Sequence, residues 1–170
     1  MNLKVAVALG SDSDLPLAKK AFRTLEDFGI EYKACVLSAH RTPDRAAEFA
    51  RGAREAGFGV IVAFAGMSAA LAGALAAHTT LPVIGVPCPG AAAGGLGGLD
   101  ALLSTVQMPT GVPVATVAIG GGANAAILAA QILSLSDAGL AEKLSRHKMT
   151  MEADAMEKNT TTFDEGERGL

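Results

Sequence analysis

Five short apolar runs alternate with segments of helical pattern along this chain. The runs cover residues 3–9, 31–37, 59–64, 83–86 and 113–119, which are lengths typical of strands. Helices are expected at residues 14–28, 43–56, from about 67 onward, at 100–107 and at 124–134. Short connections in this order indicate parallel strands joined by right-handed crossovers. The sequence therefore predicts an α/β protein, a three-layer α/β/α sandwich with a parallel flavodoxin-like sheet.

Composition narrows the classes of protein to which this chain can belong. Its 170 residues suffice for one domain with a full hydrophobic core, and its net charge of -3 gives no basic face for nucleic acid. Cys35 and Cys88 show no Cys-x-x-Cys spacing and no neighbouring histidine, so neither a disulfide framework nor a metal site is expected. The first apolar run begins without a signal-peptide pattern. We therefore expect a cytoplasmic protein that binds no metal and no nucleic acid.

The segment from residue 56 to residue 136 carries one formally charged side chain, that of Asp100. Residues 60–77 are apolar over a length that could cross a membrane, but they consist largely of alanine and glycine and lack basic flanks. Strands covered by helices on both faces explain the apolar runs better. Because the small-residue helices carry too little charge for the surface of a monomer, we expect a homo-oligomer and no membrane contact.

The last part of the chain returns to mixed charge. Leu140, Leu144, Met151 and Ala155 fall near one helical face, which predicts an extra C-terminal helix up to residue 158. This helix suits exchange with a neighbouring subunit, and packing on its own domain is equally allowed. The polar residues 159–170 are expected to form a flexible tail, so residues 1–158 would be a single domain.

Two polar clusters directly follow apolar runs. Ser11, Ser13 and Asp14 come after the first run, and the sequence Ser-Ala-His-Arg-Thr-Pro at residues 38–43 comes after the second. The carboxyl ends of parallel strands meet at one edge of the sheet, where open α/β folds bind ligands. Hydroxyls and a guanidinium can hold phosphate, a carboxylate can hold sugar hydroxyls, and an imidazole titrates near neutral pH. The two clusters therefore predict a nucleotide-type active site.

Structural roles compete with this interpretation. Serine and aspartate are common turn and cap residues, which explains the first cluster equally well when it is taken alone. His40 is favoured as a catalytic group because it lies at the ligand-binding end of the sheet, beside Arg41. His78 is instead expected to cap the end of a helix, and His147 is expected to be solvated on the last helix.

Two glycine-containing segments follow later strands. Gly66 and Ser68 come after the third apolar run and could border a cramped, mostly apolar floor of the same site, although tight helix–sheet packing accounts for most of their small neighbours. The glycine-rich residues 94–100 lack the spacing of a dinucleotide fingerprint, and no Walker A sequence occurs. For this segment we expect a flexible lid or a close approach of the backbone.

Four segments together resemble one enzyme family, that of the catalytic subunit of phosphoribosylaminoimidazole carboxylase. They are Gly-Ser-Asp-Ser-Asp at residues 10–14, the sequence at residues 38–43, Gln-Met-Pro at residues 107–109 and Asn-Ala-Ala at residues 124–126. The resemblance runs from about residue 3 to residue 137. It implies an enzyme of de novo purine synthesis that generally forms octamers and works without a metal or cofactor.

The resemblance also assigns roles to individual residues. His40 would be the general acid/base, which removes the ring proton after carbon 4 has attacked carbon dioxide. The first polar cluster would hold the ribose and phosphate end, the second would add phosphate contacts, and two residues after the third strand would border the carboxylate pocket. The substrate-binding residues so implied are Ser11, Ser13, Asp14, Ser38, Arg41, Gly66 and Ser68. The implied partners are a small-molecule ribonucleotide and carbon dioxide.

The carboxyl donor divides this family into two classes. Class I mutases move a carboxylate from the exocyclic nitrogen of N5-carboxyaminoimidazole ribonucleotide to carbon 4, whereas class II carboxylases use carbon dioxide directly. Ala70 replaces a class I pocket histidine, and residues 68–73 resemble class II, whereas residues 41–43 and 106–109 resemble class I. The balance narrowly favours the mutase, an isomerase, and the carboxylase, a lyase, stays open.

Two other functions also stay open. One is a non-catalytic nucleotide-binding module of the same fold, which would not need His40 at this position. The other is the pyridinium carboxylase of nickel-pincer cofactor synthesis. That enzyme usually carries an extra amino-terminal domain and lacks the sequence found here at residues 38–43, so this chain disfavours it.

Overall fold

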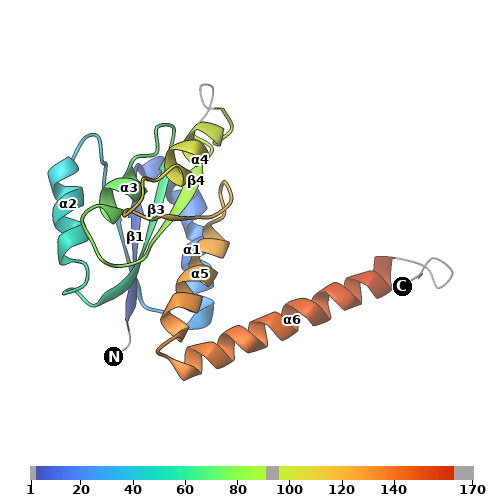
Figure 1. The fold of residues 1–170 in the computed structure, drawn as a ribbon. Coiled ribbons are helices and arrows are strands. Elements are labelled where there is room, and N and C mark those ends of the chain that lie inside the picture. The colour runs from blue at the N-terminus through green and yellow to red at the C-terminus, as the bar shows by residue number, and fades with distance from the viewer. Residues whose placement is uncertain (1–2, 91–95, 163–170) are drawn as a thin grey trace.

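The computed structural model describes residues 3–90 and 96–162 (Figure 1). Its strands form one parallel sheet in the order β2-β1-β3-β4-β5. The strands are β1 (Lys4–Leu9), β2 (Tyr32–Val36), β3 (Phe58–Gly66), β4 (Val83–Cys88) and β5 (Ala115–Thr116). This order is that of a flavodoxin-like sheet, so the predicted fold class is confirmed.

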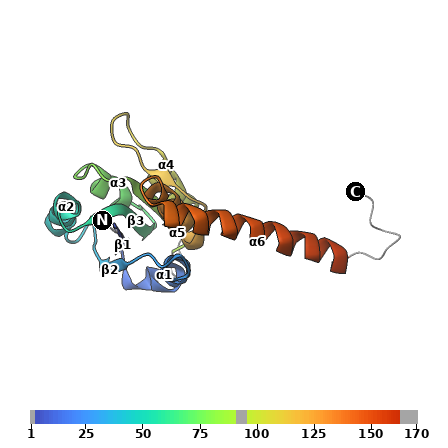
Figure 2. The ribbon, with the colours of Figure 1, turned by 90° about the horizontal axis from the view of Figure 1, so that it is seen from below.

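Helices cover both faces of the sheet (Figures 1 and 2). One face packs against α1 and α5, and the other packs against α2, α3 and α4. The helices are α1 (Leu15–Phe28), α2 (Pro43–Gly52), α3 (Leu71–Ala76), α4 (Leu99–Val106), α5 (Gly122–Ser134) and α6 (Ala138–Thr162), and a 3-10 turn, η1 (Asp12–Asp14), precedes α1. These bounds confirm the predicted order of strands and helices.

Strand β1 shows why the apolar runs are continuous. Its side chains alternate between the faces, with Val5 and Val7 in the core against α1 and α5, and Ala6 and Ala8 in the core against α2 and α3. All four side chains are buried. A strand buried on both faces needs apolar residues at every position, which explains the apolar runs without a membrane. No helix in the described part of the chain is long and apolar enough to span a membrane.

Several expected boundaries differ from the structure; α2, for example, ends at Gly52 rather than at residue 56. Two of the differences have identifiable reasons. Helix α3 begins at Leu71 rather than near Met67, because Met67 has a left-handed backbone with φ 55° and cannot lie in a right-handed helix. Strand β5 spans two residues rather than seven, because this edge segment pairs with β4 alone and Pro113 has no N–H to donate. The segment still follows β4 beyond Thr116, since the Val117 N–H donates to the Gly85 carbonyl over 3.1 Å.

Helix α6 leaves the body of the molecule (Figures 1 and 2). It begins where the Asp137 carboxylate accepts the Leu140 N–H over 3.0 Å. Leu140 is buried, whereas Met151 and Ala155 farther along the same face are exposed. Packing of the whole helix on its own domain is therefore wrong, because only its first turns meet α5 and α1. The helix continues to Thr162, and the part of the expected flexible tail at residues 163–170 lies outside the described residues.

His147 is not the solvated residue that the sequence suggested. It is half-buried, and its ring stands edge-on to that of Phe28 with 5.4 Å between ring centroids. Lys143, one turn earlier, donates from Nζ to the Phe28 carbonyl over 2.7 Å. These two contacts bind the start of α6 to the end of α1, which sets the direction in which α6 departs.

Candidate active site

The candidate site is a cavity of about 540 Å³ at the carboxyl ends of β1, β2 and β3. Strand β2 lies on one side of β1, and β3 lies on the other, so the direction in which strands are added to the sheet reverses between β1 and β3. Open α/β sheets bind ligands at such a switch point. The structure brings all eight predicted site residues to this cavity: Ser11, Ser13, Asp14, Ser38, His40, Arg41, Gly66 and Ser68.

The loop after β1 is shaped by its own hydrogen bonds. The Ser11 hydroxyl accepts the Ser13 N–H over 3.3 Å, and the Asp14 carboxylate accepts the Ser11 N–H over 3.0 Å, in the reciprocal pattern of a capping box. The cap that the sequence offered as an alternative role is therefore real, but it belongs to η1 rather than to α1. Gly10 lies just before it, where a Cβ would make a tight contact of 3.3 Å with the Phe64 carbonyl.

Asp14 and Cys88 form a buried pair at this edge of the sheet. Asp14 exposes 7% of its surface, and burial raises the pKa of its carboxyl, although hydrogen bonds from the Ser11 backbone and the Cys88 thiol lower it. Burial, and then the nearby Asp14 charge, raises the pKa of the Cys88 thiol to about 12. The thiol therefore keeps its proton at physiological pH and can donate it to the carboxylate. It also lies 3.6 Å from the Val86 carbonyl, a second acceptor.

Arg41 connects the second polar cluster to the first. Its Nε donates to the Ser38 hydroxyl over 3.3 Å, and its Nη2 donates to the Gly10 carbonyl over 3.2 Å. The Ser38 hydroxyl also accepts the Arg41 N–H over 3.1 Å. The Thr42 hydroxyl donates to the Ser38 carbonyl over 3.0 Å and makes no capping bond to α2, although Thr42 directly precedes that helix. The guanidinium is thus oriented before any ligand arrives, and its positive charge faces the cavity.

His40 lies on the same turn, next to Arg41, and is exposed. Its imidazole makes no hydrogen bond to any other residue in the described part of the chain. A side chain with both ring nitrogens available can accept or donate a proton at a bound ligand. The geometry therefore permits the acid/base role that the sequence suggested.

The loop after β3 forms the less polar side of the cavity. A Cβ at Gly66 would lie 3.3 Å from the Cys88 carbonyl and 3.4 Å from the Gly90 backbone, so β3 and the segment after β4 approach closely here. Ala70 and Leu71 complete this side. The cavity thus has a charged, hydroxyl-rich side and an apolar side.

Sequence reasoning did not assign several residues of this cavity to the site, among them Met67 and Gly90, nor Cys88 in its wall. Cys88 supports Asp14. Met67 could have been noticed between Gly66 and Ser68, but its left-handed backbone has no sequence signal of its own. The expected lid at residues 94–100 includes Gly94 and Gly95, which lie outside the described residues.

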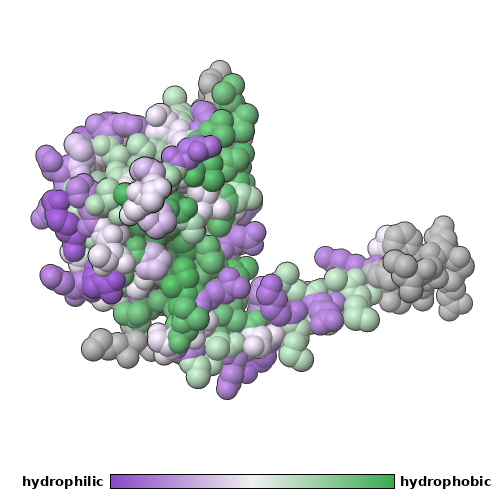
Figure 3. All heavy atoms as spheres, in the orientation of Figure 1, coloured by the Kyte–Doolittle hydropathy of each residue, from purple (hydrophilic) through white to green (hydrophobic). Residues whose placement is uncertain are grey.

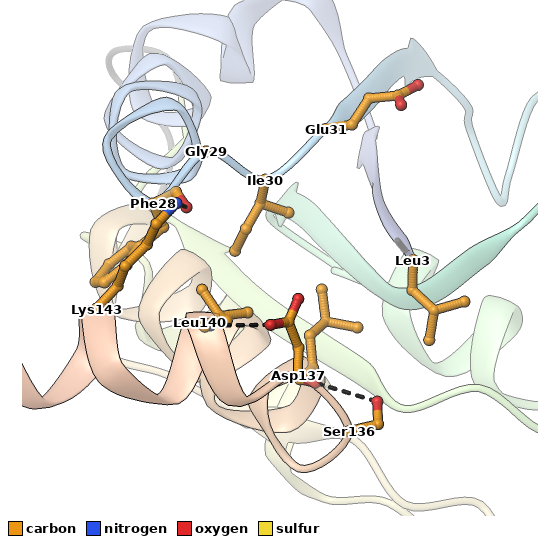
Figure 4. A pocket seen from close by; sticks show the side chains of 11 residues that line it. Leu3, Phe28, Gly29, Ile30, Glu31, Ser136, Asp137, Leu140 and Lys143 are labelled. Carbon is orange, nitrogen blue, oxygen red and sulfur yellow. Dashed lines mark hydrogen bonds between the residues drawn. The ribbon is translucent and has the colours of Figure 1, made fainter. Parts of the chain in front are cut away.

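A smaller cavity of about 250 Å³ lies at the opposite end of the sheet (Figure 4). It is bounded by Leu3, the turn after α1 and the start of α6, where Lys143 and Asp137 make the contacts that fasten α6. None of the predicted site residues reaches it. Here Lys143 joins α6 to the end of α1, Asp137 caps the start of α6, and Glu31 lies 4.0 Å from the Lys4 ammonium, so we interpret this cavity as a junction between elements.

Comparison with known proteins identifies relatives over most of the chain. A family model described as AIR carboxylase matches residues 4–154. A protein of Pyrococcus abyssi named N5-carboxyaminoimidazole ribonucleotide mutase is 54% identical, over 87% of this chain and 83% of its own length. One of Thermotoga maritima with the same name is 51% identical over 91% of this chain and 89% of its own.

Two solved structures have a fold similar to that of this chain. The crystal structure of Treponema denticola PurE2-S38D superposes with a TM-score of 0.82 at 28% identity, covering 95% of this chain and 98% of that one. The crystal structure of Treponema denticola PurE superposes with a TM-score of 0.80 at 29% identity, covering 92% and 96%. Since the family model spans most of the sequence and the relatives match over most of both chains, this protein belongs to the AIR carboxylase family.

Proposed function

We propose that this protein is an N5-carboxyaminoimidazole ribonucleotide mutase, an isomerase of de novo purine synthesis. One observation carries the proposal. Relatives that are about half identical to this chain over most of its length, such as those of Pyrococcus abyssi and Thermotoga maritima, are named N5-carboxyaminoimidazole ribonucleotide mutase. The cavity at the switch point supplies the groups that such a reaction needs. A non-catalytic binding module is disfavoured, because it would not require an available imidazole at position 40.

Substrate binding is divided between the two sides of the cavity. On the polar side, Ser11, Ser13 and Asp14 hold the ribose and phosphate end, and Ser38 and Arg41 add phosphate contacts. Guanidinium–phosphate pairs are charge-assisted and directional, and Arg41 is already oriented by its bonds to Ser38 and Gly10. On the less polar side, Gly66 and Ser68 border the carboxylate end, where a small, largely apolar space suits carbon dioxide.

His40 is the proposed general acid/base. His40 donates a proton to the exocyclic nitrogen as the bond between that nitrogen and the carboxylate carbon breaks, and carbon dioxide stays in the cavity. Carbon 4 then forms a bond to the carbon of carbon dioxide, and His40 takes back the proton that carbon 4 carries. The imidazole therefore ends in its starting protonation state, and no oxidant or reductant is needed. A positioned base typically contributes about 10²–10⁴-fold to such a step.

The carboxyl donor tests this proposal directly. A mutase converts N5-carboxyaminoimidazole ribonucleotide without added bicarbonate, and the control is the same reaction with His40→Asn. The second candidate is the class II carboxylase, which Ala70 and Leu71 in the cavity wall favour through their resemblance to that class. Turnover of aminoimidazole ribonucleotide that rises with dissolved carbon dioxide, with negligible use of the N5-carboxylated substrate, would overturn the mutase and establish the carboxylase.

A homo-octamer is part of the same proposal. The exposed face of α4 carries Leu99, Leu103 and Val106, each about half exposed, and Figure 3 shows apolar surface over this helix. Apolar stripes of this kind are unusual on monomers and are typical of interfaces. Helix α6 supports the proposal too, because a helix with few tertiary contacts is only marginally stable alone.

The remaining parts of the proposal concern location and domain organisation. Two free cysteines, Cys35 and Cys88, fit a reducing compartment, and we place the enzyme in the cytoplasm. We take residues 1–158 as one catalytic domain that includes most of α6, followed by a tail at residues 159–170.

A further inference from the structure

Met67 is the residue with the least expected backbone conformation in the described part of the chain. Its φ of 55° is the one positive value found there outside glycine. Long side chains rarely adopt this region, because Cβ crowds the neighbouring carbonyl. Methionine also lacks the short polar side chain that lets asparagine or aspartate bond to the local backbone. Conformations of this kind cluster at functional sites, where the surrounding structure holds them in place.

The surroundings of Met67 explain how this conformation is maintained. Gly66, the preceding residue, ends β3, and a Cβ there would lie 3.3 Å from the Cys88 carbonyl and 3.4 Å from the Gly90 backbone, so the chain is closely confined at this point. On the other side, the Ala70 N–H donates to the Ser68 carbonyl over 2.7 Å, and Ala69 is buried. The chain must therefore turn at residue 67 between two fixed segments.

The Met67 side chain is exposed although it is apolar. It exposes 64% of its surface while lining the cavity that contains His40 and Arg41. The left-handed turn thus places a long, flexible thioether at the mouth of the candidate active site instead of in the core. Sulfur of methionine packs favourably against the edges and faces of aromatic rings. The proposed substrate carries one aromatic ring, its aminoimidazole.

We propose that the Met67 side chain packs over the aminoimidazole ring of the bound ribonucleotide and thereby sets affinity for the base rather than for the phosphate. This inference rests on the proposed function. Ser11, Ser38 and Arg41 hold the sugar–phosphate end on the polar side, so Met67 on the opposite side is free to cover the ring.

Four variants test this role. Met67→Ala removes the thioether but keeps Cβ, Met67→Gly removes both, and Met67→Leu restores an apolar chain of similar length. Met149→Ala, at an exposed methionine on α6 far from the cavity, is the control. Binding of aminoimidazole ribonucleotide and of ribose 5-phosphate is measured by calorimetry, and thermal melting is recorded for every variant.

We expect Met67→Ala and Met67→Gly to weaken ribonucleotide binding roughly 2- to 12-fold, leaving ribose 5-phosphate binding unchanged. Met67→Leu should recover most of this loss, and Met149→Ala should resemble the wild type. Met67→Gly should melt above Met67→Ala, because glycine adopts the left-handed region without strain. A variant that binds the ribonucleotide normally, or that loses both ligands equally, overturns the inference while the mutase assignment stands. A wild-type protein that binds no aminoimidazole ribonucleotide overturns both.

Discussion

The guanidinium of Arg41 donates a hydrogen bond from Nη2 to the carbonyl oxygen of Gly10 over 3.2 Å. Arg41 belongs to the loop after β2, whereas Gly10 belongs to the loop after β1, so this contact joins the two polar clusters. The same guanidinium also holds the Ser38 hydroxyl through Nε. Arg41 therefore has two roles in the proposed function, one in the shape of the site and one in phosphate binding.

Arg41→Ala is expected to weaken binding of the product ribonucleotide about 10- to 150-fold, because a lost charge-assisted contact costs roughly 1.5–3 kcal/mol. Arg41→Lys keeps the charge but cannot bond to Gly10, Ser38 and phosphate in one planar fork, so it should recover only part of the affinity. Calorimetry measures both. An unchanged dissociation constant in Arg41→Ala would mean that Arg41 shapes the site but does not bind the phosphate.

His40→Asn is expected to abolish turnover of N5-carboxyaminoimidazole ribonucleotide and to leave ribonucleotide binding nearly intact. The imidazole is assigned to proton transfer, while the phosphate contacts belong to Ser38 and Arg41. Steady-state kinetics and calorimetry on the same preparation separate the two effects. His78→Asn, at an exposed histidine outside the cavity, is the matched control. Substantial activity in purified His40→Asn would remove this residue from the mechanism.

Asp14→Asn is expected to stabilise the fold at pH 7 and to weaken ribonucleotide binding. Burial raises the pKa of Asp14 in the folded protein above its ordinary value of 3.8, so the folded state binds the proton more tightly than the unfolded state. The stabilising effect of this proton is fully present below the ordinary pKa and is lost as pH rises through the folded pKa. Asparagine carries no charge, so Asp14→Asn avoids the cost of burying one. The stability of this variant should therefore exceed that of the wild type most at pH 7, and the difference should shrink as the pH falls.

Thermal melting of Asp14→Asn and wild type between pH 7 and pH 4 checks the sign of this effect. Asp27→Asn serves as the control, because Asp27 is an exposed aspartate on α1 outside this turn. A melting temperature of Asp14→Asn below that of the wild type at pH 7 would mean that the hydrogen bonds from Ser11 and Cys88 outweigh the cost of burial.

Leu103→Asp is expected to shift the protein from an octamer to smaller species. Leu103 is central in the apolar stripe of α4, and a buried, unpaired carboxylate at an interface is strongly unfavourable. Light scattering at micromolar concentration measures the mass of both proteins. Lys19→Asp, on the exposed surface of α1, controls for the change of charge. A wild-type protein that is monomeric under these conditions would contradict the octamer.

Much of the candidate site could be predicted because its residues are local. Ser11, Asp14, Ser38 and Arg41 each follow an apolar run directly, and parallel strands bring such positions to one edge of the sheet. Roles that depend on contacts distant in the sequence could not be predicted. Cys88, at the end of β4, hydrogen-bonds to Asp14 in η1, and nothing in the sequence near either residue indicates this contact.

The sequence by itself determined the α/β class, the order of strands and helices and the place of the polar clusters, because apolar periodicity and turn residues act over a few neighbouring positions. Tertiary structure decided what depends on packing between segments far apart in the chain. The pairing of Asp14 with Cys88, the left-handed turn at Met67 and the departure of α6 from the body are of this kind. Each of these features depends on how one segment packs, or fails to pack, against another segment. Such contacts leave no local pattern in the sequence.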